Sequence, residues 1–401
     1  MNAAVRKKFS VRDLDLKGKR VFVRVDFNVP LEGGKVADET RIRASLPTIR
    51  LVLEKGGRPI LASHLGRPKG KPRPEYSLAP VAGALASLLG GARVVFCPDC
   101  VGEAALQHAA SLKDGEVLLL ENLRFHPEEE KNDPEFARNL ASLATAYVND
   151  AFGSAHRAHA SVAAICTHLR PAAAGLLMEK EIDFLGRLLG APAHPYVAVL
   201  GGAKVSDKVA LVQNLLPKVD TFLIGGAMAY TFLAARKVSV GNSRVETESI
   251  ELAGKILEEG RKAGVKIHLP SDHRVAASLE SPGPGEIIDD EVIPAGKIGL
   301  DIGPRTARSF SEALAPAGTI LWNGPVGLFE RPPFDEGSRK VAEAIVSSRA
   351  LSVAGGGDTA AALARFQLAE RFSHVSTGGG ASLEFLSGLE LPGVAALTDR
   401  S

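Results

Sequence analysis

Short apolar runs alternate with longer segments of helical periodicity along the whole chain. The short runs are rich in Val, Ile and Leu, and the longer segments place apolar residues three and four positions apart, as amphipathic helices do. This alternation predicts repeated βαβ units and parallel sheets. In residues 1–175 the expected strands are Val21–Phe27, Pro59–Ser63, Val94–Cys97, Val117–Leu120 and Tyr147–Asn149. In residues 176–401 they are Tyr196–Leu200, Thr221–Ile224, Lys266–Leu269, Thr319–Trp322, Leu351–Ala354 and His374–Ser376.

Helices are expected between these strands, for example at Glu39–Glu54, Leu78–Leu89, Ser206–Leu215 and Thr247–Lys262. A further amphipathic helix, residues 176–189, stands between the two sets of strands and is stopped by the proline-rich residues 191–195. Each half has enough strands for a sheet of its own. The pattern therefore predicts two doubly wound α/β domains joined by a helix, rather than one barrel.

Every expected strand ends in a polar cluster, and the clusters change character at the midpoint. Those of the first half carry arginine and histidine, and those of the second half carry glycine. Ligands bind beyond the carboxyl ends of strands in open α/β sheets. Arginine grips phosphates and carboxylates bidentately, whereas a glycine turn before a helix offers bare backbone to an anion. We therefore expect two anion-binding sites, one on each half.

Composition and charge limit the classes of ligand that the chain is expected to bind. Residues 1–175 contain 25 lysines and arginines against 19 aspartates and glutamates, and the remainder contains 23 against 27. A basic first half suits a small polyanion, but no concentrated basic stripe for DNA is present. Aromatic residues make up only 5% of the chain, with Trp322 the single tryptophan, which argues against single-stranded nucleic acid as a partner.

The three cysteines are Cys97, Cys100 and Cys166. The first two have C-x-x-C spacing, which suits a redox dithiol or half of a zinc site. Zinc would need a second pair of ligands, and no compact Cys/His group supplies one, so buried thiols are the favoured interpretation. Few cysteines, a polar start and no apolar run of ~18 residues lead us to expect a cytoplasmic protein without a membrane span.

The first-half clusters contain the most specific candidates. Asp26 and Asn28 are two residues apart, so on an extended strand end they face the same side. Five further side chains could each bind a phosphate or carboxylate: Arg41, His64, Arg67, Arg124 and Arg157. The alternative is a set of solvated surface arginines. His126 and His159 are interpreted as structural.

The second half lacks both the P-loop motif and the G-x-G-x-x-G fingerprint of dinucleotide-binding enzymes. Lys204 and Lys208 are four apart across a glycine turn, a spacing that places them on one helix face. Asp358 follows three glycines at an expected helix start. It could be a helix N-cap, or it could hold Mg²⁺ beside a bound phosphate.

Several long segments, in order, resemble the phosphoglycerate kinase family. They are Val21–Pro30, Ser63–Pro68, Leu120–His126, Asp150–His159, Gly201–Lys208, Leu321–Glu330 and Gly355–Thr359. The resemblance runs from about Ser10 to about Thr398. Asp272-His273 departs from it, because the family more often has apolar residues after the aspartate, and this affects only the packing of that loop.

The resemblance implies two Rossmann-like domains with the active site in the cleft between them. The first domain (1–175) would bind 3-phosphoglycerate or 1,3-bisphosphoglycerate, and the second (190–382) would bind ADP or ATP with Mg²⁺. Residues 176–189 would link the domains, and 383–401 would return to the first. The implied reaction is reversible, in-line phosphoryl transfer between 1,3-bisphosphoglycerate and ADP after hinge closure. We expect a monomer with no nucleic-acid or membrane partner.

The resemblance also implies roles for individual residues. The triose site would contain Asp26, Asn28, Arg41, His64, Arg67, Arg124 and Arg157. The nucleotide site would contain Gly202, Lys204, Lys208, Gly226, Asn323, Pro325, Glu330, Gly356, Gly357, Asp358 and Thr359, with Asp358 on the metal and Glu330 on the ribose. Arg41 and Lys204 would stabilise the phosphoryl group during its transfer, and Gly357 and Gly380 would be further catalytic positions. Gly378–Gly380 would complete the phosphate-binding backbone at the helix starts.

Two alternatives remain open. A dehydrogenase on the same architecture is disfavoured by the missing dinucleotide fingerprint. A non-catalytic nucleotide-binding or scaffold descendant would be favoured by loss of Arg41, Lys204 or Asp358, and all three are present. No general base is evident. The kinase reaction needs none, because its acceptor is an ionised phosphate or carboxylate.

Overall fold

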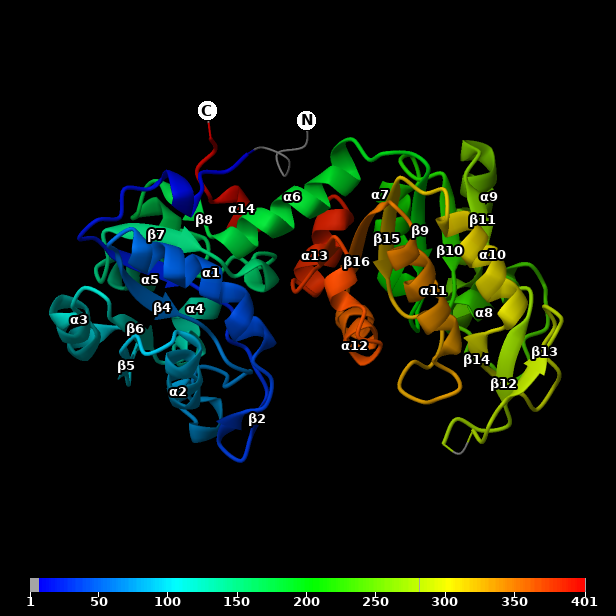
Figure 1. Cartoon of the computed structure of the whole chain (residues 1–401), viewed down its shortest axis with the longest axis horizontal. Helices are drawn as coiled ribbons and strands as arrows, with labels where there is room; N and C mark the ends of the chain where they lie inside the picture. The colour runs from blue at the N-terminus through cyan, green and yellow to red at the C-terminus, as the bar shows by residue number, and fades with distance from the viewer. Residues whose placement is uncertain (1–6, 281, 401) are drawn as a thin grey trace. The chain divides into compact units, whose positions relative to one another are not determined.

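The computed structural model of the chain describes residues 7–280 and 282–400 and divides it into two compact units. Among the described residues, the first unit comprises 7–183 and 390–400, and the second comprises 184–280 and 282–389. The division falls within helix α6 (Leu176–Gly190), which both units share (Figure 1). Each unit is built on a six-stranded parallel sheet, so the predicted α/β fold class with two parallel-sheet domains is confirmed.

The sheet of the first unit has the strand order β5-β6-β4-β1-β7-β8, and all its neighbouring strands are parallel. Its strands are β1 (Arg20–Arg24), β4 (Arg58–Ala62), β5 (Val94–Cys97), β6 (Val117–Leu120), β7 (Ala146–Asn149) and β8 (Ala172–Ala174). A short hairpin adds β2 (Leu31–Glu32) and β3 (Lys35–Val36). The helices are α1 (Thr40–Glu54), α2 (Ala79–Leu88), α3 (Gly102–Ser111), α4 (Pro127–Glu130), α5 (Pro134–Ala141) and α14 (Pro392–Ala395).

The first core forms because successive side chains of a strand point to opposite faces of the sheet. Val21 and Val23 of β1 pack in one cluster with buried residues of α1 and α2, including Ile49. Phe22, between them, lies on the other face and stacks on Tyr147 of β7 at a centroid distance of 6.1 Å. Both faces are therefore covered, as a parallel sheet requires.

The sheet of the second unit has the order β11-β10-β9-β15-β16-β17 and is also parallel throughout. Its strands are β9 (Tyr196–Leu200), β10 (Thr221–Ile224), β11 (Lys266–His268), β15 (Thr319–Asn323), β16 (Leu351–Gly355) and β17 (His374–Val375). The helices are α7 (Val209–Leu215), α8 (Met228–Ala235), α9 (Ile250–Ala263), α10 (Pro304–Leu314), α11 (Glu336–Ser347), α12 (Gly357–Arg365) and α13 (Gly380–Leu386). Trp322 of β15 is fully buried in a core cluster with residues of α10, α11 and α12.

The second unit also contains a small antiparallel sheet that the apolar pattern does not predict. It has the order β13-β12-β14, formed by β12 (His273–Ala276), β13 (Glu286–Ile288) and β14 (Ile298–Ile302). β13 is a three-residue strand and two of its residues are exposed, so it leaves no buried apolar run in the sequence. Short, partly solvated strands carry too little periodicity to be recognised.

Three single-turn 3₁₀ helices lie in loops that carry candidate residues or next to them. η4 (Leu123–Phe125) follows β6, η5 (Phe152–Ser154) follows β7, and η7 (Ser206–Lys208) precedes α7. The expected helix Ser206–Leu215 therefore begins as a 3₁₀ turn, and its α-helical part starts only at Val209. The expected strand Val21–Phe27 ends at Arg24 instead, because the Phe27 amide donates to Ser63 Oγ (2.8 Å) rather than to a neighbouring strand.

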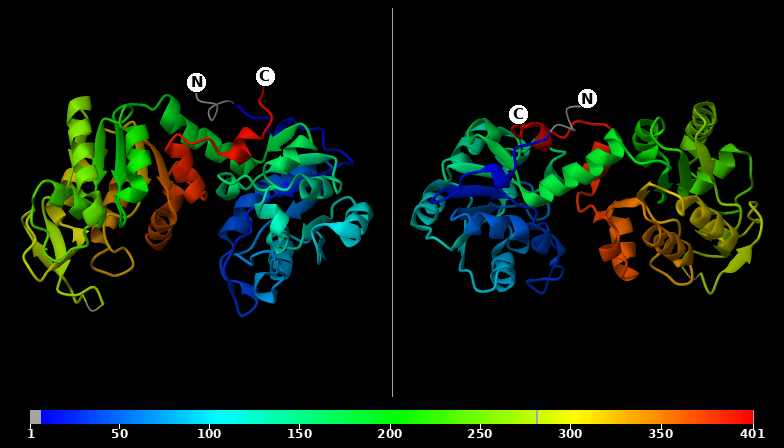
Figure 2. Two further views of the ribbon diagram at one scale, coloured as in Figure 1. Left: turned by 180° about the vertical axis from the view of Figure 1, so that it is seen from behind. Right: turned by 45° about the horizontal axis from the view of Figure 1, so that its top comes forward.

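Two chain segments pass from one unit to the other, α6 and the segment around Glu390. The latter brings the end of the chain back to the first unit, where the Phe9 amide donates to Thr398 O (2.7 Å) and the Thr398 amide to Ala172 O (3.0 Å) (Figure 2). Residues 383–389 belong to the second unit, so the return begins at Glu390 rather than at the expected 383. Within the described ranges, no helix is long and apolar enough to cross a membrane.

The start of α6 rests on a buried carboxyl group. Asp150 is fully buried, and its Oδ1 accepts hydrogen bonds from the amides of Leu177 (2.9 Å) and Met178 (3.3 Å). Burial raises the pKa of Asp150 to about 7, against the opposing effect of hydrogen bonds from Thr48, Met178 and Leu177. The folded protein thus holds a proton that an unfolded aspartate has already lost near pH 4.

We expect this group to make stability fall as pH rises. Its contribution is present below the unfolded pKa near 4 and is lost as pH rises through the folded pKa of about 7. The slope between these values is at most about 1.4 kcal/mol per pH unit. Asp150→Asn should remove this slope while keeping the oxygen that accepts from the helix amides. Urea unfolding at pH 5 and pH 7.5 tests it, since equal pH dependence in both proteins would exclude Asp150 as its source.

Candidate active site

The first-half candidates lie at the carboxyl ends of four adjacent strands. β6, β4, β1 and β7 are neighbours in the sheet, and the loops that follow them carry Arg124, His64, Asp26 and Arg157 respectively. Because the strands are parallel, these loops meet at one edge of the sheet. Arg41 reaches the same edge from the first turn of α1.

A chain of hydrogen bonds connects five of the predicted residues or their loops. Arg41 Nη1 donates to Asp26 Oδ2 at 2.6 Å, and the Asn28 amide donates to Asp26 Oδ1 at 3.2 Å. Asn28 Oδ1 accepts from the Gly66 amide (2.9 Å), and Gly66 O accepts from Arg124 Nη1 (2.9 Å). Asp26 and Asn28 lie beyond the end of β1, in an irregular segment rather than on the expected strand. This segment uses both side chains to connect the loops.

His64 is held as a neutral imidazole of defined tautomer. Its Nδ1 lies 3.1 Å from Nη2 of Arg24, a guanidinium that is fully buried. Burial, followed by the charges of Arg24 and Arg124, places the pKa of His64 well below its usual value. A guanidinium can only donate, so Nδ1 accepts and the proton resides on Nε2. His64 therefore offers one N–H donor to a ligand.

Arg24 is held by a buried network that sequence reasoning did not assign to the site. Its Nε donates to Ser161 Oγ (2.9 Å), and Ser161 donates in turn to Glu129, through Oγ at 2.6 Å and through its amide at 2.9 Å. Burial raises the pKa of Glu129, and the charge of Arg24 opposes this effect. Glu129 sits in the run Pro127–Glu130, which looks like a solvated acidic helix start, so no sequence signal identifies it.

The remaining first-half candidates differ in their environment. Arg124 is largely buried, and burial, together with the nearby charges of Arg24 and Arg157, lowers its pKa despite the ion pair with Glu130 (3.3 Å). Arg157 is exposed and contacts His156, with 3.1 Å between Nε and Nε2. Arg67 is exposed and makes no hydrogen bond or ion pair to the described residues, so the structure does not join it to the network.

The second-half candidates also occupy one sheet edge, at the carboxyl ends of β10, β9, β15, β16 and β17. Backbone hydrogen bonds tie the loops of the first three together. The Gly202 amide donates to Pro325 O (3.0 Å), the Gly226 amide to Val326 O (2.9 Å) and the Met228 amide to Gly202 O (3.0 Å). These contacts need glycine, because a Cβ at Gly226 would lie 2.7 Å from Gly202 N. By contrast, a Cβ at Gly202 or Gly357 would meet nothing within 4 Å, so both leave open backbone.

The two predicted lysines do not share a helix face, because Lys204 lies in the loop after β9 and Lys208 ends η7. Lys208 is partly buried, and its Nζ contacts Asn323 Oδ1. Burial lowers the pKa of Lys208 to about 8, while the nearby charges of Asp207 and Asp358 oppose this. Lys204 is exposed, and its ammonium makes no ion pair with any carboxylate of the described residues.

The start of α12 carries the candidate metal ligand. Gly356 is the N-cap and Asp358 lies in the first turn, so the N-cap interpretation of Asp358 is wrong. The Asp358 carboxylate is exposed and makes no ion pair within the described ranges, and a free carboxylate of this kind fits Mg²⁺, which prefers oxygen ligands. Thr359 is buried and its Oγ1 accepts from the Gly324 amide (2.7 Å), which joins the β15 and β16 loops.

The other predicted positions are peripheral to these contacts. Glu330 is exposed beyond the β15 loop. Gly379 is the N-cap of the seven-residue helix α13, which begins at Gly380, and the Gly378 amide donates to Ser376 Oγ (3.2 Å).

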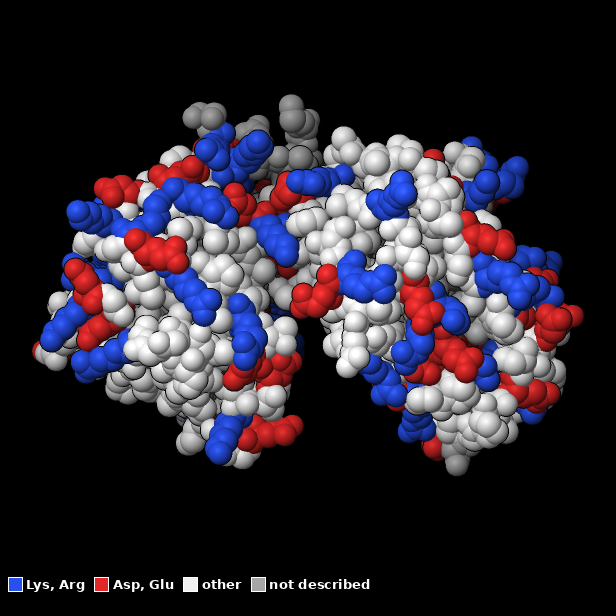
Figure 3. Space-filling model, in the orientation of Figure 1, with Lys and Arg blue, Asp and Glu red and all other residues white. Residues whose placement is uncertain are grey.

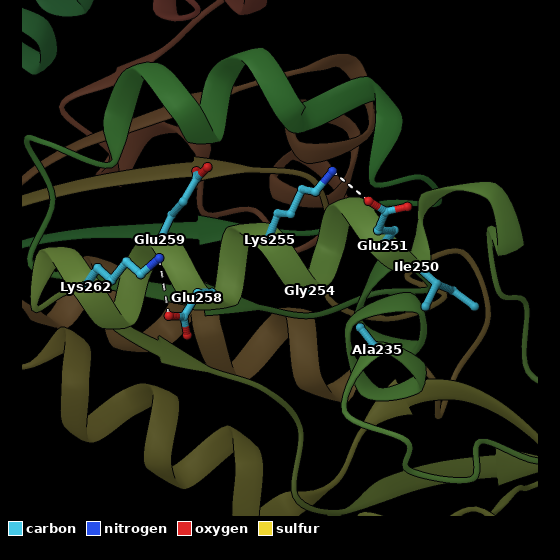
Figure 4. A pocket seen from close by; sticks show the side chains of 8 residues that line it. All are labelled: Ala235, Ile250, Glu251, Gly254, Lys255, Glu258, Glu259 and Lys262. Carbon is cyan, nitrogen blue, oxygen red and sulfur yellow. Dashed lines mark ion pairs between the residues drawn. The ribbon is translucent and has the colours of Figure 1, made fainter.

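Two further surface features of the described residues differ from these candidate sites. On the face shown in Figure 3, basic and acidic residues are interspersed over both units. A surface depression on the second unit is lined by Ala235 and residues of α9 (Figure 4). Four of its five charged side chains are paired, Lys255 with Glu251 (2.7 Å) and Lys262 with Glu258 (3.5 Å), and it contains none of the predicted residues.

Comparison with known proteins identifies the family of the chain. Residues 11–389 match the family model described as phosphoglycerate kinase. The phosphoglycerate kinase of Moorella thermoacetica is 54% identical over 98% of this chain and 100% of its own length, and that of Solibacter usitatus is 56% identical over 97% and 98%. The solved structure of phosphoglycerate kinase from Coxiella burnetii superposes with a TM-score of 0.89 at 40% identity, covering 97% of this chain and 98% of that one.

Proposed function

Because this chain belongs to the phosphoglycerate kinase family, we propose that it transfers a phosphoryl group reversibly between 1,3-bisphosphoglycerate and ADP, giving 3-phosphoglycerate and ATP. The observation that carries the proposal furthest is the first-unit network. At one end of the sheet, Asp26 holds Arg41, Arg24 holds His64, and the Gly66 carbonyl, on a loop bonded to Asn28, accepts from Arg124. Such a concentration of donors suits the phosphate and carboxylate of 3-phosphoglycerate.

We propose that the second unit binds the nucleotide. Open backbone at Gly202 and Gly357, the ammonium groups of Lys204 and Lys208, and the first turn of α12 are all suited to phosphate oxygens. Asp358 would hold Mg²⁺, which when bound neutralises charge on the nucleotide phosphates. The two substrates then start on different units, so we propose a domain closure that brings them together and excludes water.

In this mechanism the protein positions the two substrates and neutralises the charge of the transferred group, and it moves no proton. The acceptor oxygen is already ionised near neutral pH. Arg41 and Lys204 would oppose the charge on the oxygens of the transferred group, and His64 would orient the acid through Nε2–H. We further propose a monomer in the cytoplasm, and sedimentation at micromolar concentration checks the monomeric state.

Arg124→Ala is expected to raise the KM for 3-phosphoglycerate at least tenfold with a smaller change in kcat, the scale of a charged hydrogen bond made to bound substrate. Steady-state kinetics at saturating ATP measure this effect. Arg138→Ala is the matched control, because Arg138 is an exposed arginine of the same unit that pairs only with Glu135 (2.6 Å). An unchanged KM in Arg124→Ala would remove Arg124 from the site.

The reaction itself is tested by trapping its product. The chain is incubated with ATP, Mg²⁺ and 3-phosphoglycerate in the presence of hydroxylamine, which converts an acyl phosphate to a hydroxamate. Hydroxamate that forms only when 3-phosphoglycerate is present supports the proposal. Folded protein that binds ATP but yields no hydroxamate would refute it and favour the non-catalytic, nucleotide-binding descendant.

A further inference from the structure

A second cluster of chemically reactive side chains lies in the first unit. Asp99, Cys100 and His126 each offer one ligand atom, and the three atoms lie within 4.8 Å of one another. Asp99 and Cys100 come from the turn between β5 and α3, and His126 follows η4 at the start of α4. The mechanism proposed above uses none of them. The C-x-x-C motif noticed in the sequence contributes only its second cysteine to this cluster.

The arrangement is more than an incidental contact. His126 Nε2 lies 2.8 Å from Asp99 Oδ1, and the His126 ring packs on Phe136 at a centroid distance of 5.3 Å. Cys100 is buried, at 1% exposure, while the side chains of Asp99 and His126 are 48% and 30% exposed. Two of the three ligand atoms therefore belong to side chains open to solvent, and the thiol lies within 4.8 Å of both atoms.

We propose that Asp99, Cys100 and His126 form a binding site for Zn²⁺ or a similar borderline-soft divalent cation, with one water as the fourth ligand. Thiolate, imidazole and carboxylate are all zinc ligands, with bonds of about 2.0–2.3 Å in tetrahedral geometry. Donor atoms of such a tetrahedron lie closer together than 4.8 Å, so small side-chain rotations suffice. A thiolate ligand also selects against Mg²⁺, which prefers oxygen.

Metal binding releases one proton, that of the Cys100 thiol. The Cys100 S–H bond breaks, the Sγ–metal bond forms, and the thiol proton passes to solvent. Facing a carboxylate, the metal-free His126 carries its proton on Nε2, and that proton moves to Nδ1 when Nε2 becomes the ligand. Metal affinity should rise as pH rises, because a thiol binds a metal only after it has lost its proton.

An occupied site would join two loops that are separate in sequence. One is the turn after β5, and the other is the segment that carries Arg124, two residues before His126. The metal would hold these two loops together beside β5, an outer strand of the first sheet.

The test uses the full chain, freed of metal by chelation and titrated with Co²⁺ in place of Zn²⁺. A thiolate ligand gives Co²⁺ an intense charge-transfer band in the near ultraviolet, so only sites containing one of the three cysteines are seen. We expect the band to saturate at about one equivalent, to disappear when Zn²⁺ is added and to persist in excess Mg²⁺. Absence of a thiolate band in the wild-type chain would overturn the proposal.

Variants assign the ligands. Cys100→Ser should abolish the band, and His126→Asn should weaken Co²⁺ binding at least tenfold. Cys97→Ser and Cys166→Ser are the matched controls, since both are buried cysteines outside the cluster, and they should keep the band. A band that survives Cys100→Ser, or that depends on Cys97 instead, would overturn the proposal. His126→Asn, which leaves the buried thiol in place, keeps the test valid if Cys100→Ser fails to fold.

Discussion

Replacing Lys204 by alanine is expected to lower kcat by at least ~10²-fold, the scale of losing one donor to the transition state. Lys204 follows the first strand of the second sheet, and its exposed ammonium is not neutralised by any carboxylate of the described residues. Such a positive charge can stabilise the negative oxygens of the phosphoryl group while this group passes from the donor molecule to the acceptor molecule. A loss in kcat without a comparable rise in KM would show that the interaction is made mainly in the transition state.

The control for Lys204 is Lys255→Ala on α9, an exposed lysine that forms an ion pair with Glu251 on the same helix. Both variants should retain wild-type circular dichroism, because neither removes a buried contact. Folded Lys204→Ala protein that turns over at the normal rate would exclude this lysine from catalysis.

Arg41→Ala is expected to have an effect of similar or greater size, because it removes a proposed transition-state donor and also leaves Asp26 without its ion-pair partner. Arg41 Nη1 lies 2.6 Å from Asp26 Oδ2, and the Arg41 side chain is still 38% exposed, so part of the guanidinium remains free for a ligand. The expected fall in kcat is at least ~10²-fold. Arg41→Lys should recover little, because lysine cannot bond Asp26 and a phosphoryl oxygen with one planar fork.

Arg43→Ala provides the comparison for Arg41. Arg43 lies two residues further along α1, is exposed, and pairs with Glu39 at 2.6 Å. Its loss should leave kcat within twofold of wild type. Comparable losses in both variants would mean that α1 is sensitive to any change of charge, and the assignment of Arg41 would fail.

The parallel sheets could be predicted because their strands are buried apolar runs. β9 and β10 have the predicted bounds, Tyr196–Leu200 and Thr221–Ile224. β8 was missed for a physical reason, since its three residues are all alanine, which has a low preference for strands. Alanine fits there because the strand is fully buried at the edge of the first sheet.

Candidate site residues could be named from the sequence only where a polar cluster stands at or after the end of an expected strand. His64, Arg124 and Asn323 were named by that rule. The structure places His64 after β4, Arg124 in η4 and Asn323 at the end of β15, each with a hydrogen-bond partner. The buried residues that hold Arg24 were not predicted, because Ser161 and Glu129 are more than a hundred residues away from Arg24 in the sequence. Their residue types are ordinary in loops and helix starts, and only the fold brings them to a buried charge.

The hydrogen bonds between Phe9, Ala172 and Thr398 also determine the order in which the protein can be completed during synthesis. Most of the first unit leaves the ribosome before the second, yet its closing contacts come from residues that are translated after the whole of the second unit. Domains usually fold as units in the order of their synthesis. Here the second unit has its whole chain available while the first still lacks residues 390–400, so the half that is made first is the half that is finished last.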